Sequence, residues 1–418
     1  MTDSEVRTGH DGHGSLSLHD PGRHRPLDAE AWSPDLVEDE IRDVIRDFEA
    51  ARQPDGSWPT HPFESPSRAP RWCQFEGAAG AVVAMRLLRE AGYPAPDVSG
   101  LLPGIHEHYI RHPDVGHETG LHLGEAGILA PAVLTGAIDD RGVERLLECM
   151  RATIGHPARE TTSGETGIMH AALTLFRATG ERRWAGVYQD AARSLFAAWI
   201  QHPPSGVWLW RSDIFGSVRH YYGACHGVAG NAAALLRGAD LLPEEWLEIV
   251  LARTTEALLQ GAIRSGAAVN WPVSADASGT RRLVQWCHGA TGIVAALADA
   301  PRTGSEASAQ LDPLLEEAGE FVWNAGPVKK GPGICHGTVG AGYAFLGLYR
   351  RTGDGRWLER ARCFAMHAIG QRRRGRARHG QGKYTLWTGD GGFAVYLHHC
   401  LLQEAGPVPT PFPGLEAF

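Results

Sequence analysis

The sequence lacks several features that would place it in a specialised class of protein. None of its apolar runs approaches the roughly 20 residues that a membrane-spanning helix needs, so no membrane span is expected. Residues 1–20, MTDSEVRTGHDGHGSLSLHD, contain no apolar core of a secretory signal. Basic residues are not in excess, since 40 Lys and Arg stand against 48 Asp and Glu, for a net charge of -8. This balance argues against a nucleic-acid partner.

Cysteines are too few for a fold held together by disulfides. The 418 residues include seven cysteines, and three of these are followed directly by histidine. Reduced thiols in a cytoplasmic protein, used for metal binding or catalysis, fit this pattern better than a disulfide framework. The length is sufficient to bury a large core.

Strand patterns are also scarce, with short candidates only near residues 207–210 and 269–273. Helices with one buried face are predicted by apolar stripes over residues 37–48, 143–150, 314–322 and 357–368. Asp312 and Pro313 predict the start of the third of these helices. Segments that are apolar on all sides, which indicate helices covered all round, include residues 78–88 and 291–297.

A Gly-x-x-Gly unit opens each segment that is apolar on all sides. The seven units begin at Gly77, Gly124, Gly164, Gly227, Gly289, Gly337 and Gly389. Because the chain has 52 glycines, about six such units are expected by chance, so the number alone decides nothing. The placement is more informative, since successive units lie 40 to 63 residues apart, which leaves room for a helix pair. We predict one all-α domain of concentric helix rings, closed so that no end needs capping.

The predicted domain covers residues 30–405. Residues 1–29 are polar and rich in His, Gly and Asp, and are expected to form a flexible N-terminal tail. Its histidines, His10, His13, His19 and His24, belong to a residue type that binds metals, but a flexible tail that binds no metal is the favoured interpretation. Residues 406–418 are expected to form a C-terminal tail.

Three of the glycine units carry the same pair of chemically active residues. Cys225-His226, Cys287-His288 and Cys335-His336 open the segments CHGVAG, CHGATG and CHGTVG. They offer six soft or borderline ligands of the kind that zinc binds tetrahedrally. The spacing matches no zinc finger, so a metal site would have to be assembled by the fold. On chemistry alone, three buried cysteines in similar repeats remain the alternative.

The motifs around these pairs resemble those of a known family. YYGACHGVAG (221–230), QWCHGATGI (285–293) and KKGPGICHGTVGAGYAFLGLYRRTGD (329–354) look like signature motifs of the LanC-like proteins, the lanthionine synthetase C relatives. KYTLWTGDGGFAVYL (383–397) resembles the closing repeat of that family. The resemblance is close over about 220–400 and weaker before it. It implies an α/α toroid, a double ring of seven helix pairs with Gly-x-x-Gly at the start of the inner helices.

The resemblance also assigns roles to the three Cys-His pairs. It places zinc ligands at Cys287, Cys335 and His336 and the active-site histidine of the family at His226. Cys225 then becomes a neighbour of the site.

Further catalytic candidates follow from the same resemblance. His288 becomes a candidate proton carrier, and Arg281 or Arg282 fits a basic residue that the family places before its first ligand. Lys330 matches a lysine of the glutathione-adding branch. An acidic residue that peptide cyclases place ahead of their third repeat has no clear counterpart, although Glu160 stands nearby.

The implied activity is zinc-dependent thioether formation. A thiol activated as a zinc-bound thiolate adds to dehydroalanine or dehydrobutyrine in a peptide or protein. The thiol is either an internal cysteine, which gives a lanthionine ring, or glutathione. The motif form and Lys330 favour the glutathione-adding branch.

Two other classes of function stay open. One is a non-catalytic zinc scaffold that binds peptides. The other is a six-hairpin toroid glycosidase that uses Glu76, Glu125 or Glu165, although sugar hydrolysis has no use for soft ligands. The basic run from Arg372 to Arg378 is expected to be an exposed loop without a partner, with an acidic or phosphorylated peptide as the less favoured interpretation.

Overall fold

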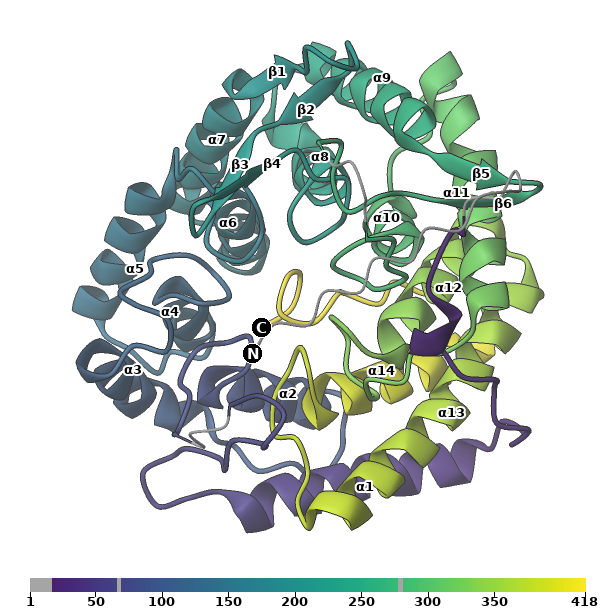
Figure 1. Cartoon of the computed structure of the whole chain (residues 1–418). Helices are drawn as coiled ribbons and strands as arrows, with labels where there is room; N and C mark the ends of the chain where they lie inside the picture. The colour runs from purple at the N-terminus through teal and green to yellow at the C-terminus, as the bar shows by residue number, and fades with distance from the viewer. Residues whose placement is uncertain (1–16, 66–68, 277–280) are drawn as a thin grey trace, which may run out of the picture.

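The computed structural model describes residues 17–65, 69–276 and 281–418, and fourteen α-helices form most of this part of the chain. They alternate between an outer and an inner ring (Figure 1). The outer ring comprises α1 (Pro34–Ala51), α3 (Leu102–Arg111), α5 (Asp140–Thr153), α7 (Arg182–Ala197), α9 (Glu244–Gly261), α11 (Glu306–Ala325) and α13 (Gly355–His379). The inner ring comprises α2 (Ala78–Glu90), α4 (Ala126–Leu134), α6 (Glu165–Thr179), α8 (Val228–Arg237), α10 (Ala290–Leu297), α12 (Thr338–Thr352) and α14 (Asp390–Leu402). The predicted all-α double ring of seven helix pairs is confirmed.

The two rings differ in how much of each helix is buried. Outer helix α1 buries Val37, Ile41 and Val44 along one stripe and exposes acidic residues opposite. Inner helix α12 is buried at every position from Thr338 to Tyr349, because helices surround it on all sides. The core of the protein therefore lies between and within the rings.

One predicted helix boundary was wrong. Helix α11 begins at Glu306, where the Ser305 hydroxyl accepts a hydrogen bond from the amide of Ser308 at 3.3 Å. Pro313 lies inside the helix rather than at its start. A proline inside a helix costs one backbone hydrogen bond. The packing of the long apolar face of α11 against α9, α10 and α12 offsets this cost.

The glycine units let each inner helix begin directly against the turn that precedes it. A Cβ atom on Gly292 would lie 1.8 Å from the carbonyl oxygen of Trp286, and one on Gly340 would lie 2.3 Å from that of Ile334. Gly289 has a φ of +87°, which side chains rarely adopt. The second glycine of a unit is therefore required by close packing of backbone on backbone.

Short elements decorate the rings. Three antiparallel hairpins pair β1 (Trp199–Gln201) with β2 (Trp208–Trp210), β3 (Ser212–Ile214) with β4 (Ser217–Arg219), and β5 (Ile263–Ser265) with β6 (Ala268–Asn270). The 3-10 helices are Pro21–Arg23, Ser99–Leu101, Ala239–Leu241 and Gln403–Ala405. Strand β2 overlaps the candidate predicted near residues 207–210, and β6 overlaps the one predicted near residues 269–273.

The terminal segments pack against the rings. The C-terminal segment, residues 406–418, runs into the middle of the inner ring (Figure 1), where Phe412, Leu415 and Phe418 are buried. Residues 17–29 lie against the loop after α11. The amide of Arg25 donates to the carbonyl of Pro327, and the amide of Lys329 donates to the carbonyl of Arg23. In residues 17–29, where a flexible tail was expected, the chain is held by these contacts. His10 and His13 lie outside the described residues. None of the described helices has the length and apolarity needed to cross a bilayer.

Candidate metal centre

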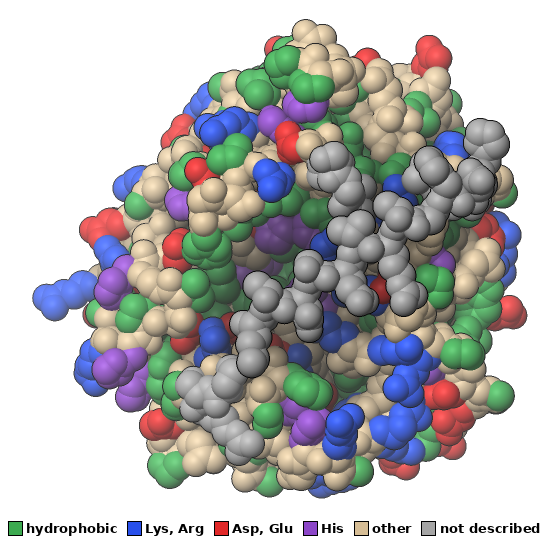
Figure 2. Space-filling model, viewed as in Figure 1, with side chains coloured by type: hydrophobic (Ala, Val, Ile, Leu, Met, Phe, Trp, Pro, Cys, Tyr) green, Lys and Arg blue, Asp and Glu red, His purple; other side chains and the backbone are tan. Residues whose placement is uncertain are grey.

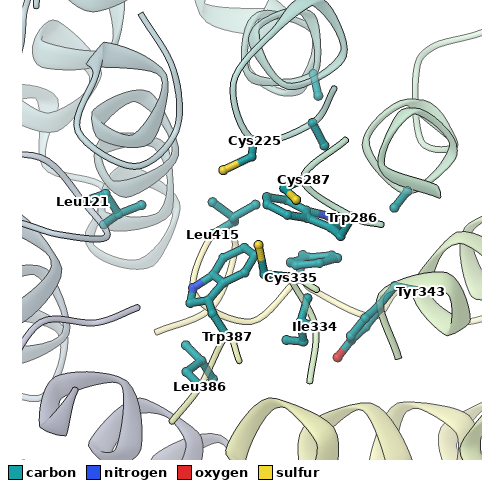
Figure 3. Close-up of a cluster of buried hydrophobic side chains, with 14 of the residues drawn as sticks. Leu121, Cys225, Trp286, Cys287, Ile334, Cys335, Tyr343, Leu386, Trp387 and Leu415 are labelled. Carbon is teal, nitrogen blue, oxygen red and sulfur yellow. The ribbon is translucent and has the colours of Figure 1, made fainter. Parts of the chain in front are cut away.

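Two of the three Cys-His-Gly units meet at the centre of the molecule. Cys287 precedes α10 and Cys335 precedes α12, and both thiols are almost completely buried. The ligand atoms of Cys287, Cys335 and His336 all lie within 4.8 Å of one another. The sulfur of Cys335 is 3.8 Å from Nε2 of His336 and points toward Cys287 (Figure 3). The sulfur of Cys225 points away from this group (Figure 3).

A circle of backbone hydrogen bonds brings the turns before the inner helices together. Between six of the seven pairs of neighbouring repeats, a backbone amide in one turn donates to a backbone carbonyl in the turn of the next repeat. The residues in these bonds are Phe75, His122, Thr161, Thr162, Cys225, Cys287, Cys335 and Trp387. Among the described residues, no backbone bond joins the Cys287 turn to the Cys335 turn. The ligand group bridges this step, so an ion held there would link the fifth repeat to the sixth.

The electrostatics of the group favour a cation. A hydrogen bond from Cys335 lowers the pKa of Cys287, against the effect of burial. Burial, followed by the neighbouring Cys287, raises the pKa of Cys335. The two sulfurs therefore share one proton, and a metal ion can replace it. Two cysteine sulfurs and one imidazole form a donor set that zinc prefers, with a fourth position left open. The residues present fit a zinc ion.

A charged histidine lies beside the metal group. Nδ1 of His226 is 2.8 Å from Oε2 of Glu160, and the Glu160 side chain has no exposed surface. The amides of Thr162 and Ser163 also donate to this carboxylate. Burial opposes its ionisation, but hydrogen bonds from His226 and Thr162 lower the pKa of Glu160 to about 2. Although burial acts against it, Cys225 and Glu160 raise the pKa of His226 well above its ordinary value.

The second candidate for proton transfer, His288, is electrostatically different. Its ring lies 5.3 Å from that of His226 and 5.8 Å from that of Tyr221. Burial lowers the pKa of His288 to about 4, and its buried Nδ1 has no hydrogen-bond partner among the described residues. His288 is therefore neutral near pH 7, whereas His226 carries the proton.

Comparison with known proteins identifies the family. Residues 143–412 match the family described as lanthionine synthetase C-like protein. The chain belongs to this family.

The LanC-like chain is similar to proteins of animals and plants. It is 32% identical over 197 residues to "Glutathione S-transferase LANCL1" of Danio rerio, which covers 47% of this chain and 46% of that protein. It is 38% identical over 147 residues to "LanC-like protein GCL1" of Arabidopsis thaliana, which covers 35% of this chain and 32% of that protein. The similarity thus spans less than half the length of either relative.

The fold agrees with that of a solved structure of low sequence identity. "Nisin cyclase" matches with a TM-score of 0.57 over 90% of this chain and 96% of that chain, at 14% identity. At this identity the likeness concerns the fold, and it confirms the toroid predicted for the LanC-like chain.

A cavity of about 670 Å³ reaches the metal group at His336. It is lined by Arg25, His61, Phe63, Glu64, Phe75, Glu76, Lys329, Lys330, residues 331–333, His336, Gly337, Gln371, Arg372, residues 374–376, Arg378, His379, residues 381–383, Thr388 and Asp390. Eight of the lining residues are Lys or Arg and three are Asp or Glu. In the view of Figure 2, Lys and Arg side chains gather over the region of α13. Arg372, Arg374, Arg376 and Lys383 form ion pairs with acidic side chains, whereas Arg25, Lys329, Lys330 and Arg378 form none among the described residues. These four cations without an acidic partner suit an anionic ligand.

The predicted basic residues fall at different places around the site. Lys330 lines the cavity, and its charge offsets only part of the rise that burial causes in the pKa of Cys335. Arg281 is exposed but close enough to act on the charge of His288. The Arg282 guanidinium instead donates to the carbonyl of Ser17. The choice between the two arginines, left open by the sequence, thus has one difference to draw on, the charge effect of Arg281 on His288.

The basic run is helical and not the loop that was expected, although Arg373, Arg374, Arg376 and Arg378 are exposed as predicted. It forms the last turns of α13, and the side chain of Arg372 is only 2% exposed. Its guanidinium contacts four carboxylates, those of Glu40, Asp43, Asp47 and Asp390, at 2.7 to 3.4 Å. The Arg372 guanidinium is buried against α1 and α14, and a buried charge requires partners of opposite charge. The sequence of the basic run alone does not show which carboxylates these are.

The three glutamates of the glycosidase interpretation do not form a common site. Glu125 binds Arg145 and His106, which lower its pKa to about 2 against the effect of burial. Glu165 accepts the amide of Gly155 at the start of α6. Glu76 alone lines the cavity, where burial is the main cause that raises its pKa to about 7. Glu125 and Glu165 therefore do not pair with Glu76, whose carboxylate neighbour in the cavity is Glu64.

Sequence reasoning missed part of this site. The role of Glu160 was left open, and the structure places it against His226. Glu64, which lies against Lys383 and accepts from Thr388, was not considered at all. Glu160 stands four residues before Gly164, in the turn of the third repeat, which was the one signal available.

Proposed function

We propose that the protein adds thiols to dehydroamino acids in a peptide or protein, forming a thioether. The observation that carries the proposal is the meeting of Cys287, Cys335 and His336 at the end of a positive cavity. Membership of the LanC-like family and similarity to a relative named as a glutathione S-transferase support it.

Cys287, Cys335 and His336 would hold the metal ion, which we propose to be zinc. Bound zinc would supply Lewis acidity, which favours the ionised form of a substrate thiol at neutral pH. The ligands must be free thiols, so a reducing compartment such as the cytoplasm suits this chemistry.

His226 is the proposed proton donor. In the addition, a C–S bond forms at the β-carbon and the π electrons of the double bond move to the α-carbon. The α-carbon then takes one proton from the His226 imidazolium, while the thiol loses its own proton to solvent. Glu160 accepts from Nδ1 of His226 and so holds the ring with Nε2 free for this transfer. His288, neutral and next to His226, takes a secondary role in proton movement.

The cavity is the proposed site of the thiol donor. Glutathione carries two carboxylates, and Lys330 lines the cavity and acts through its charge on Cys335. Arg281 lies on the His288 side, where it would stabilise negative charge on the dehydroamino acid. The positive lining favours glutathione over an internal cysteine of the peptide, which would bring no carboxylates of its own.

The direct test is an adduct assay. The zinc-loaded protein is incubated with a dehydroalanine peptide and glutathione, and mass spectrometry follows the increase in peptide mass. A second peptide that contains both a cysteine and a dehydroalanine tests cyclisation, which conserves mass and blocks the cysteine from alkylation. A Cys335→Ala variant corrects for uncatalysed addition. Enzyme-dependent products support the proposal, whereas zinc binding without either product leaves a peptide-binding scaffold as the function.

A further inference from the structure

A second group of metal-ligating side chains lies away from the Cys-Cys-His centre. His202 begins the turn between β1 and β2, His220 directly follows β4, and Asp276 lies in the segment after β6. The ligand atoms of all three lie within 4.8 Å of one another. Three hairpins that are separate in sequence therefore bring two imidazoles and one carboxylate together.

The distances within this group are those of ligands around one ion. Nδ1 of His220 is 2.7 Å from Oδ1 of Asp276, and Nε2 of His202 is 3.7 Å from the same oxygen. A tetrahedral ion with bonds of about 2.0–2.1 Å separates its ligand atoms by roughly 3.3 Å. Side-chain shifts of a few tenths of an ångström to about half an ångström would therefore bring these ligand atoms to the separation that a tetrahedral ion requires.

The two histidines are already oriented. The ring of His202 is fixed by a 2.8 Å hydrogen bond between its Nδ1 and the Ser205 hydroxyl, which leaves Nε2 for Asp276. The amide of His220 donates to Oδ2 of Asp276 at 2.6 Å. Partners of this kind hold the rings of metal ligands in place.

One nitrogen in the group has no explanation in the fold. Nε2 of His220 is buried and has no hydrogen-bond partner among the described residues. A buried imidazole nitrogen left without a partner costs free energy, since it has lost its hydrogen bonds to water. An ion on the Nδ1 side of this ring, where Asp276 lies, would leave Nε2 as it is, so this nitrogen does not count toward the site.

We propose that His202, His220 and Asp276 form a second, independent site for a divalent transition-metal ion. Two imidazoles and a carboxylate, with Asp276 partly exposed, leave further positions for water. The site lies on the chain segment that leads to Tyr221, whose ring is 5.9 Å from that of His226. A bound ion would therefore fix one end of the segment that carries the proposed proton donor.

Cobalt titration separates the two sites. The full-length protein is freed of metal with a chelator and titrated with Co²⁺ while its absorbance is recorded. The thiolate centre gives sulfur-to-cobalt charge transfer in the near ultraviolet, whereas a His-His-Asp site does not. We expect two ions per wild-type chain and one in a His202→Gln/His220→Gln double variant, with the charge-transfer band unchanged. His220→Gln alone is expected to weaken the binding of the second ion by about 10-fold or more.

Two controls make the outcome decisive. His117→Gln removes an exposed histidine and should keep both ions. Cys287→Ala should lose the charge-transfer band yet keep the second ion, so failure of the thiolate centre and failure of this site give different results. One ion per wild-type chain, or a second ion retained by the double variant, would overturn the proposal. Should the double variant fail to fold, His220→Gln alone still decides, because the group of Glu160, Cys225 and His226 also has metal-ligand spacing and is untouched by this change.

Discussion

Nδ1 of His226 donates a hydrogen bond to Oε2 of Glu160 across 2.8 Å, and the carboxylate is sealed from solvent. The pair joins the turn before α6 to the turn before α8, two repeats that lie side by side in the inner ring. A buried carboxylate that stabilises the imidazolium also decides which ring nitrogen faces the substrate. The pair therefore has both a structural and a chemical consequence.

The chemical consequence is tested by replacing each partner. His226→Asn should keep zinc at the wild-type stoichiometry but slow thioether formation by about 10²- to 10⁴-fold, because the proton donor is lost. Glu160→Gln should slow it too and shift the pH–rate profile, since the imidazolium loses its counter-charge. Glu125→Gln, which alters another buried carboxylate with basic partners, serves as the control. An unchanged rate in His226→Asn would remove its proposed role.

The structural consequence appears as a pH dependence of stability. The pKa of Glu160 is about 2 in the folded protein and 4.5 ordinarily, so its ionisation stabilises the fold above pH 4.5 by about 3 kcal/mol. This contribution is lost as the pH falls from about 4.5 toward 2. Urea unfolding should therefore show a difference between wild type and Glu160→Gln that is largest between about pH 4.5 and 6.5 and shrinks below about pH 4, since the raised pKa of His226 contributes fully only below pH 6.5. A difference that does not depend on pH would contradict the ionised state of Glu160.

The metal centre makes a prediction about local stability. Cys287→Ala and Cys335→Ala should each lose most of the bound zinc, while Cys225→Ala, a change in the same motif, should keep it. Chelation should raise amide hydrogen exchange most in the turns before α10 and α12, because no backbone bond joins the Cys287 and Cys335 turns. Zinc content and exchange by mass spectrometry measure both effects. Zinc retained in both ligand variants would mean that the ligands are other residues.

The sequence predicted the fold well because its pattern is local. Each inner helix starts at its own glycine unit, and the clash of a Cβ on Gly292 with the Trp286 carbonyl explains why the glycines recur. The start of α11 was predicted wrongly, since the preference of Pro313 for a first turn was outweighed by tertiary packing.

The site was less accessible to the sequence because its partners are distant in the chain. His226 and Glu160 are 66 residues apart, and Arg372 is 332 residues from Glu40. A charge run carries no information about which carboxylates fold over it. The resemblance assigned ligands in two of the three Cys-His pairs, but only the fold brings Cys287, Cys335 and His336 within reach of one ion.

The C-terminal segment, which the sequence assigned to a tail, supports the metal centre from inside the ring. The Phe412 ring lies 5.5 Å from that of Trp286 and 5.7 Å from that of Trp387. Trp286 precedes Cys287, and the carbonyl of Trp387 accepts from the amide of Cys335 at 2.9 Å. Phe412 thus packs behind both ligand turns.

Phe412→Ala should therefore affect stability and zinc affinity together. The cavity left by the ring should cost about 3–5 kcal/mol in urea unfolding. Zinc affinity, measured against a competing chelator under folding conditions, should also fall, because Trp286 and Trp387 lose the surface that positions the two turns. Phe215→Ala removes a ring that is 69% exposed and should change stability by no more than about 0.5 kcal/mol. If Phe412→Ala loses stability but binds zinc as tightly as wild type, the segment closes the ring without positioning the centre.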